Sequence, residues 1–215
     1  MESSDTREKS VLCFGDSLTW GYNPVSGERH PRHQRWPFVA ESHLGSGYHL
    51  IEEALNGRTT VVDDPYRDFR SGKSVLPMLL ESHSPIDLVV IFLGVNDFKF
   101  RSSQTSREVA LGILSLYNTV VTSRAGPDQT SPECLIVSPP LIPEPHGMMN
   151  TLFRNGLDEV PKLFAELEMA SETFPLHLLD AAQIVKPSVP DGIHLSTEET
   201  EKLGIAIGTR IGELI

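Results

Sequence analysis

Short apolar runs rich in β-branched or aromatic residues recur along the chain. The clearest are residues 11–14, 87–93 and 134–137, and the weaker candidates are residues 49–54, residues 176–179 and the pair Val61 and Val62. Continuous apolar runs of this length are typical of strands that are covered on both faces, as in parallel sheets. We therefore expect these segments to form a mostly parallel sheet.

Apolar residues at helical spacing fill the stretches between these runs. These stretches are residues 36–44, 75–82, 106–123, 152–172 and 197–215. Strands that alternate with helices predict repeated βα units around one parallel sheet. No change of composition divides the chain. We expect a single domain over residues 1–215, in which the polar residues 1–9 form a flexible N-terminal tail.

The last of these stretches has the clearest local pattern. Ser196 is expected to cap the N-terminus of a helix, and Glu199, three residues later, is expected to complete a capping box. An apolar stripe follows, made of Leu203, Ile207, Ile211 and Leu214. We expect this stripe to pack on the sheet and to close the fold.

The charge of the chain narrows the classes of function. Its 215 residues include 18 Lys and Arg against 29 Asp and Glu, which gives a formal charge of −11. Nucleic-acid binding depends on Lys and Arg that neutralise phosphates, so we expect no nucleic-acid partner. No stretch approaches the roughly 18 consecutive apolar residues of a membrane span, and the polar N-terminus differs from a secretory signal. We expect a cytoplasmic protein with no membrane partner.

Neither the cysteines nor the histidines indicate a metal site. Cys13 and Cys134 both lie in apolar runs, which favours buried free thiols. His30 and His33 lie three residues apart in a loop rich in Pro and Arg, with no cluster of carboxylates nearby. We expect neither a metal nor another cofactor.

The first candidate for chemistry is Gly15-Asp16-Ser17-Leu18, directly after the run 11–14. Ligands of parallel α/β sheets bind at the carboxyl ends of the strands, where a serine would meet a substrate. Gly15 allows a tight turn, and the amide of Ser17 at a helix start can face a developing negative charge. Helix capping by Asp16 or Ser17 explains the same residues equally well. The block alone leaves both roles open.

The second candidate is Asp191-Gly192-Ile193-His194, just before the last helix. A serine nucleophile needs a base to take its proton, and the base needs an acceptor that holds its tautomer. Asp191 and His194 can meet in one turn and supply both groups, because they are three residues apart with a glycine between them. A histidine near a helix start is also commonly an ordinary surface or core side chain.

Two further blocks follow predicted strands. Asn96, in Gly94-Val95-Asn96-Asp97, comes after the run 87–93, and its side-chain amide can donate a hydrogen bond to an oxyanion. Gly57, in Asn56-Gly57-Arg58, comes after the run 49–54, and a glycine lets its backbone N–H approach a ligand closely. Both sequences are also common in turns.

Together the four blocks resemble the SGNH, or GDSL, family of serine hydrolases. The blocks of that family supply a Ser, a Gly, an Asn and an Asp-x-x-His, which match Ser17, Gly57, Asn96 and the pair Asp191 and His194. The resemblance implies a flavodoxin-like three-layer α/β/α sandwich with a mostly parallel, five-stranded central sheet. It also implies a catalytic triad of Ser17, Asp191 and His194, and an oxyanion hole formed by Ser17, Gly57 and Asn96.

Residues 13–24, 56–65, 87–97 and 138–146 are similar to the bacterial arylesterase/acyltransferase subgroup of that family. This similarity implies a serine esterase that hydrolyses short-chain aryl or alkyl esters through an acyl-enzyme, with acyl transfer to alcohols as a side activity. It also implies a homo-oligomer, up to an octamer. The best-known acyltransferase of the subgroup has an alanine where this chain has Gly57, so simple hydrolysis is the expected reaction.

Other functions remain open within the same resemblance. A carbohydrate acetylesterase, a lysophospholipase or a thioesterase would differ from an arylesterase only in its substrate. A non-catalytic binding protein could keep the scaffold, although the intact set of five block residues argues against it.

Four aromatic residues lie in or between the blocks, namely Trp20, Phe98, Phe100 and Phe153. They could form the wall of a small apolar acyl pocket or pack beneath the loops. We expect Trp20, three residues after Ser17, and Phe153 to contact the substrate.

Overall fold

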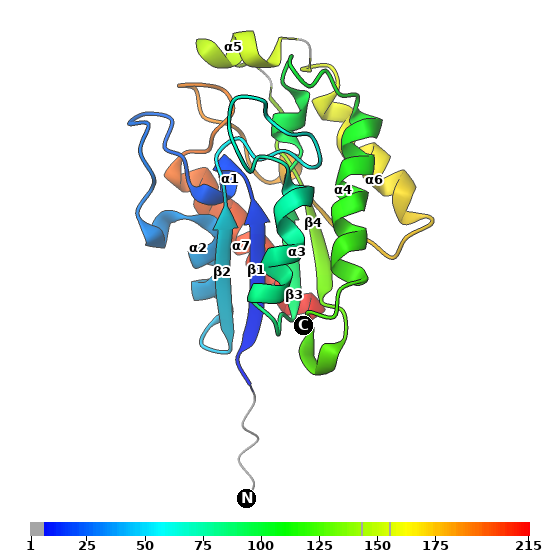
Figure 1. Cartoon of the computed structure of the whole chain (residues 1–215). Helices are drawn as coiled ribbons and strands as arrows, with labels where there is room; N and C mark the ends of the chain where they lie inside the picture. The colour runs from blue at the N-terminus through cyan, green and yellow to red at the C-terminus, as the bar shows by residue number, and fades with distance from the viewer. Residues whose placement is uncertain (1–6, 143, 155) are drawn as a thin grey trace, which may run out of the picture.

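The computed structural model describes residues 7–142, 144–154 and 156–215. Within them the chain forms a five-stranded sheet whose strands all run parallel, in the order β2-β1-β3-β4-β5 (Figure 1). The strands are β1 Lys9–Gly15, β2 Tyr48–Ala54, β3 Leu88–Phe92, β4 Glu133–Ser138 and β5 His177–Asp180. The expected parallel sheet is confirmed, with the two weaker runs 49–54 and 176–179 at its edges.

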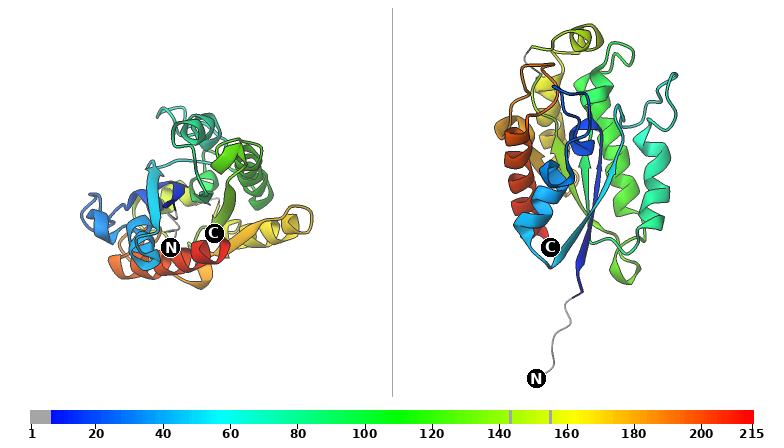
Figure 2. Two further views of the ribbon diagram at one scale, coloured as in Figure 1. Left: turned by 90° about the horizontal axis from the view of Figure 1, so that it is seen from below. Right: turned by 90° about the vertical axis from the view of Figure 1, so that its left-hand side faces the viewer.

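Helices cover both faces of the sheet. The α-helices are α1 Ser17–Trp20, α2 Trp36–Leu44, α3 Gly72–Ser82, α4 Ser106–Val121, α5 Met148–Phe153, α6 Leu163–Ser171 and α7 Thr197–Leu214. Short 3₁₀-helices are η1 Arg32–Gln34, η2 Val95–Phe98, η3 Pro127–Gln129, η4 Val160–Lys162 and η5 Ala181–Gln183. Helices α2 and α7 pack together on one face, and α3, α4 and α6 cover the other (Figure 2). The predicted three-layer sandwich is therefore confirmed.

The core of the molecule lies on both sides of the inner strands. All five residues of β3 are buried, as are residues 11–15 of β1. The last helix buries Leu203, Ile207 and Ile211 as its sequence predicts. Removing apolar surface from water stabilises the folded state by about 25 cal/mol per Å². Because the inner strands are covered on both faces, apolar side chains are favoured at every position, which explains their unbroken apolar runs. Cys13 and Cys134 are buried free thiols, as expected.

The carboxyl ends of β1, β2 and β3 lie level with one another. Gly15 pairs with Ala54 of β2 on one side and with Phe92 of β3 on the other. The chain leaves β1 toward β2 and later returns past β1 to β3, so the strand order reverses between β1 and β3. In open α/β sheets ligands bind in the crevice at such a reversal.

Two sequence expectations about elements are wrong. Val61 and Val62 form no strand, because side chains take their carbonyl groups: Ser71 Oγ donates to the Val61 oxygen at 3.1 Å, and Thr59 Oγ1 donates to that of Val62. The helix expected over residues 152–172 is divided into α5, η4 and α6. Gly156 lies in the break, where a Cβ would come within 2.1 Å of the Phe98 carbonyl oxygen.

The ends of the chain also differ from expectation in detail. Ser196 Oγ caps α7 by accepting from the Glu199 amide at 3.2 Å, but the Glu199 side chain does not complete a capping box. It accepts instead from the Lys186 amide at 2.8 Å. Of the expected tail, residues 1–6 lie outside the described residues, and Lys9 already begins β1. In the described part of the chain, every helix is too short or too polar to cross a membrane.

Candidate active site

Ser17 stands at the first position of α1, two residues after β1 ends. Asp16 caps this short helix, since its Oδ1 accepts from the Leu18 amide at 2.9 Å. The capping role that the sequence left open therefore belongs to Asp16, and Ser17 is left with its hydroxyl at the end of the sheet. Its side chain is buried against a neighbouring histidine but reaches a cavity.

His194 and Asp191 come to Ser17 from the other end of the chain. The Nε2 atom of His194 lies 2.8 Å from Ser17 Oγ, and Nδ1 lies 2.5 Å from Asp191 Oδ2. The segment before α7, orange in Figure 1, returns to the end of the sheet at which α1 begins. The structure thus brings the three predicted triad residues into one chain of hydrogen bonds.

A tight turn holds this pair in place. Asp191 Oδ1 accepts from the amides of Ile193 and His194, both at 2.9 Å. Gly192 has a φ of 73°, and a Cβ there would come within 2.2 Å of the Glu144 carbonyl oxygen. A side chain at Gly192 would therefore be strained and would clash. Ser188 fixes the other side of His194, because its amide and hydroxyl donate to the His194 carbonyl at 2.8 and 2.7 Å.

The environment of Asp191 favours its ionised form. Burial alone would raise the pKa of Asp191, but the hydrogen bonds from the His194 ring and from the His194 and Ile193 amides hold this pKa below its ordinary value. A carboxylate that stays charged keeps the Nδ1–H tautomer of His194 and leaves Nε2 free to accept a proton.

Gly57 and Asn96 lie beside Ser17, as the sequence blocks predicted. Gly57 adopts a φ of 83°, a conformation that L side chains rarely take. The Asn96 side chain is buried, and its Nδ2 atom donates to Asp16 Oδ2 and to the Arg58 carbonyl, both at 3.0 Å. These bonds tie the ends of β1, β2 and β3 together and hold the amide of Asn96 at the cavity.

Two buried carboxyl groups, those of Asp16 and Asp97, form hydrogen bonds with the segments that carry the candidate site residues. Burial raises the pKa of Asp16 to about 6, and the Leu18 amide and the nearby His194, Lys99 and Arg58 charges oppose that rise. Burial also raises the pKa of Asp97 to about 7, against hydrogen bonds from Thr60. The Thr60 amide and hydroxyl donate to Asp97 Oδ1 at 3.0 and 2.6 Å. Asp97 thereby anchors residues 55–71 to the segment that carries Asn96.

A cavity of about 420 Å³ opens above Ser17 and His194. One wall is apolar and comes mainly from α5: Met148, Met149, Leu152, Phe153 and Ile193. The lining also contains three cationic side chains, called here the cationic wall: Arg67, Lys99 and Arg101. Tyr22, Asn56, Gly57 and Asn96 complete the lining. Such a mixture of an apolar wall and a few convergent polar groups is typical of small-molecule sites.

Of the two aromatic residues expected to contact the substrate, one lines the cavity and the other does not. Phe153 lines the cavity, whereas Trp20 lies against the Arg29 guanidinium, 4.9 Å from its ring centroid, and is not part of the lining. Tyr22 takes that position, with its ring centroid 4.4 Å from that of His194. Sequence reasoning chose Trp20 for its nearness to Ser17 along the chain, and the turn after α1 carries Tyr22 to the site instead.

Phe98 and Phe100, the other two aromatic candidates, support the surroundings. Phe98 is buried in the core, and Phe100 stacks under the Arg154 guanidinium and donates its amide to the Leu152 carbonyl at 2.7 Å. The cationic residues and α5 were not found from the sequence. Lys99 and Arg101 follow the Asn96 block closely, which is the signal that could have found them.

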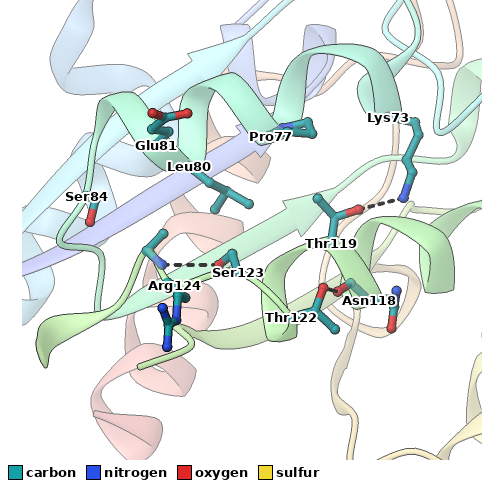
Figure 3. A pocket seen from close by; sticks show the side chains of 11 residues that line it. Lys73, Pro77, Leu80, Glu81, Ser84, Asn118, Thr119, Thr122, Ser123 and Arg124 are labelled. Carbon is teal, nitrogen blue, oxygen red and sulfur yellow. Dashed lines mark hydrogen bonds between the residues drawn. The ribbon is translucent and has the colours of Figure 1, made fainter. Parts of the chain in front are cut away.

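A larger cavity, of about 640 Å³, lies between α3 and α4, away from the triad. Lys73 of α3 is already bonded across it, because its Nζ donates to Thr119 Oγ1 of α4 at 2.7 Å (Figure 3). No residue of the triad or its donors lines it in the described part of the chain. The smaller cavity is therefore the candidate active site.

The profile of the GDSL-like Lipase/Acylhydrolase family matches residues 13–198. The chain belongs to this family. The match spans all four sequence blocks, from Ser17 to His194. It confirms the family that these blocks predicted. Comparison with curated proteins found no match.

Solved esterases share the fold of this family member over nearly its whole length. Est24, a carbohydrate acetylesterase from Sinorhizobium meliloti, is 39% identical, with a TM-score of 0.91 over 96% of this chain and 100% of that chain. The aryl esterase of M. smegmatis is 37% identical, with a TM-score of 0.91 over the same shares. These neighbours agree with the expectation of a carboxylic ester hydrolase.

The buried acid Asp97 should make stability depend on pH. Its ordinary pKa is 3.8 and its pKa in the folded protein is about 7. Between these values the folded state holds a proton that the unfolded state has released. The free energy of unfolding should therefore fall as pH rises, by up to about 1.4 kcal/mol per pH unit. Urea unfolding at a series of pH values measures this slope.

Asp97→Asn should make the slope shallower from about pH 6 to about pH 7, above the range in which Asp16 titrates. Asp158→Asn, which changes an exposed carboxylate, should keep the wild-type slope. Equal slopes in wild type and Asp97→Asn would contradict the assignment of Asp97 as a buried acid.

Proposed function

We propose that the protein is a serine esterase that hydrolyses short-chain acyl esters through an acyl-enzyme. The observation that carries this proposal is the chain of hydrogen bonds from Ser17 through His194 to Asp191 on the floor of the cavity. The first step transfers the Ser17 hydroxyl proton to His194 Nε2 while Oγ bonds to the ester carbonyl carbon. Asp191 stabilises the imidazolium that forms.

The carbonyl oxygen becomes an oxyanion that needs hydrogen-bond donors. The amide of Ser17 has no acceptor within its own helix, because it belongs to the first turn. The Gly57 amide donates to no backbone or side-chain acceptor among the described residues. Asn96 offers its side-chain amide as a third donor, shared with Asp16 and Arg58 before the reaction. Donors held in place in this way stabilise charge that develops in the transition state.

The alcohol then leaves with the proton that His194 holds. A water molecule, deprotonated by the same His194, attacks the acyl carbon; the bond to Ser17 Oγ then breaks, Oγ regains the proton from His194, and the acid is released. An alcohol in place of water would give acyl transfer, which stays a prediction. Gly57 at the second oxyanion position favours hydrolysis, because the best-known acyltransferase of the resembled subgroup has alanine there.

The size and lining of the cavity support small substrates. A volume of about 420 Å³ with an apolar wall from α5 suits a short acyl chain or an aryl group. An arylesterase is the first candidate because the sequence blocks resemble that subgroup, and the M. smegmatis aryl esterase is similar over nearly the whole chain. A carbohydrate acetylesterase is the second, because Est24 is equally similar in fold.

We further propose that the protein assembles into a homo-oligomer, up to an octamer. Large apolar side chains are exposed in segments that follow the carboxyl ends of strands, where they surround the catalytic end of the sheet: Val25, Tyr66, Phe69, Met148 and Val189. Exposed apolar side chains of this kind commonly mark protein interfaces. Residues 21–37, which contain Val25, and residues 138–145 are the segments through which subunits would narrow the entrance.

Replacement of the nucleophile should abolish both turnover and labelling. Ser17→Ala should lower kcat for 4-nitrophenyl acetate by roughly 10⁴-fold or more, because no other group can form the acyl-enzyme. It should also remove covalent modification by a fluorophosphonate probe, read by mass spectrometry. Ser171→Ala, at an exposed serine of α6, should keep both properties. Labelling of another residue, or turnover by Ser17→Ala, would sink the assignment.

Loss of the third oxyanion donor should slow the chemistry without abolishing it. Asn96→Ala should lower kcat by roughly 100- to 1,000-fold, with a much smaller change in KM. A melting curve must accompany the assay, because Asn96 also ties Asp16 to Arg58. Asn118→Ala, on the surface of α4, is the matched control. Turnover near that of wild type would remove Asn96 from the mechanism.

Assembly should be visible in solution. Light scattering or sedimentation at micromolar concentration should give a mass several times that of one chain, because single chains would leave the exposed apolar side chains in water. A clean monomer under these conditions would contradict the proposed oligomer and would leave the proposed chemistry unaffected.

A further inference from the structure

The catalytic cavity carries an unusual set of charges for an acidic protein. The chain has a net charge of −11, yet the cavity lining contains the cations Arg67, Lys99 and Arg101. Among the described residues that line the cavity there is no Asp or Glu. A carboxylate on a bound molecule would therefore meet positive charge on one wall.

Two of these cations already have a partner. Arg67 Nη2 lies 3.0 Å from Asp64 Oδ2, and Arg101 Nη2 lies 3.4 Å from the same oxygen. Asp64 lines a small neighbouring cavity of about 90 Å³ together with Lys99 and Arg101. One carboxylate, that of Asp64, thus pairs with two guanidinium groups. The two arginines and Asp64 together keep a net positive charge.

Lys99 has no such partner. In the part of the chain that the structure describes, its Nζ atom makes no salt bridge within 4.0 Å and no hydrogen bond. The ammonium lies 5.9 Å from the centroid of the Phe153 ring, which belongs to the apolar wall. Lys99 comes three residues after Asn96, which places it beside the proposed oxyanion donors.

The surroundings of Lys99 leave its charge uncompensated. Burial, together with the charges of Arg67 and Arg101, lowers the pKa of Lys99 to about 8, against the opposite effect of Asp16 and Asp64. A partly buried cation without an ionic partner is costly. An anion that enters the cavity would relieve that cost and form a charge-assisted hydrogen bond.

We propose that Lys99, with Arg67 and Arg101 beside it, makes the site selective for esters that carry a carboxylate on their acyl or alcohol part. This inference rests on the proposed ester hydrolysis and narrows its substrate class. Lys99 supplies the ammonium that pairs with the carboxylate, and the two arginines keep the wall positive. The apolar wall of α5 holds the uncharged remainder of the ester.

Matched pairs of esters test the selectivity. One pair is 4-acetoxybenzoate and its neutral amide, 4-acetoxybenzamide, which place the charge on the alcohol part. The other is monomethyl succinate and methyl succinamate, which place it on the acyl part. The measured quantity is the ratio of kcat/KM for the anionic ester to kcat/KM for its neutral partner. Turnover of 4-nitrophenyl acetate, assayed alongside, separates the two proposals, because an enzyme that does not cleave it contradicts the ester hydrolysis itself.

In at least one pair, Lys99→Gln should lower this ratio by about tenfold, since an ionic hydrogen bond is lost. Lys99→Arg, which keeps the charge, should hold the ratio within roughly threefold of wild type. Lys162→Gln changes the net charge equally at an exposed lysine outside the cavity and should leave the ratio unchanged. If Lys99→Gln leaves the ratio within roughly twofold of its wild-type value in both pairs of esters, the proposal is overturned.

The wild-type enzyme provides a test that needs no variant. As pH rises through about 8, Lys99 loses its proton, so the ratio should fall, whereas any effect of pH on the shared catalytic steps changes both esters of a pair alike. In Lys99→Arg the ratio should hold over the same range, because an arginine stays charged. A wild-type ratio that is flat from about pH 7 to about pH 9 would count against the proposal.

Discussion

The level alignment of β1, β2 and β3 at their carboxyl ends is the constraint on which the site depends. Gly15 pairs with Ala54 and with Phe92, so the segments that carry Ser17, Gly57 and Asn96 leave the sheet at one edge. A slip of one residue would displace a strand by about 3.3 Å and turn its buried side chains to the opposite face. The apolar packing that sets the register of the strands therefore also sets the spacing of the proposed catalytic groups.

A buried network of hydrogen bonds extends this alignment from the strand ends to the proposed catalytic groups. Asn96 joins Asp16 to the Arg58 carbonyl, and the Arg58 guanidinium returns to the Gly15 carbonyl at 3.0 Å. Asp97 adds a second tie through Thr60. Burial disfavours the ionised forms of Asp16 and Asp97 and therefore raises the pKa values of both carboxyl groups. The free-energy cost of burying these carboxyl groups occurs where their hydrogen bonds hold three chain segments in one geometry.

The architecture could be predicted from local signals in the sequence, and the residues of the proposed triad could be predicted because four blocks together resemble one family. Apolar runs mark strands buried on two faces, and each block stands at a strand end or before a helix. Residues whose position depends on turns could not be predicted: the αL residue Gly21 ends α1 and leaves Tyr22, rather than Trp20, at the cavity. The break between α5 and α6 depends on the close approach of Gly156 to Phe98, a contact far apart in sequence. Asp64, which holds Arg67 and Arg101 together, gives no periodic signal at all.

The division of the cavity between two parts of the chain has a consequence for how this enzyme can change. Ser17, Gly57 and Asn96 follow directly on strands of the sheet, whereas most of the apolar wall belongs to α5, where Met148 is exposed and only Phe153 is fully buried. Substitutions at exposed positions generally cost little folding free energy. New ester preferences can therefore evolve, or be engineered, by altering this short rim helix, while the reactive machinery and the folding of the domain stay intact.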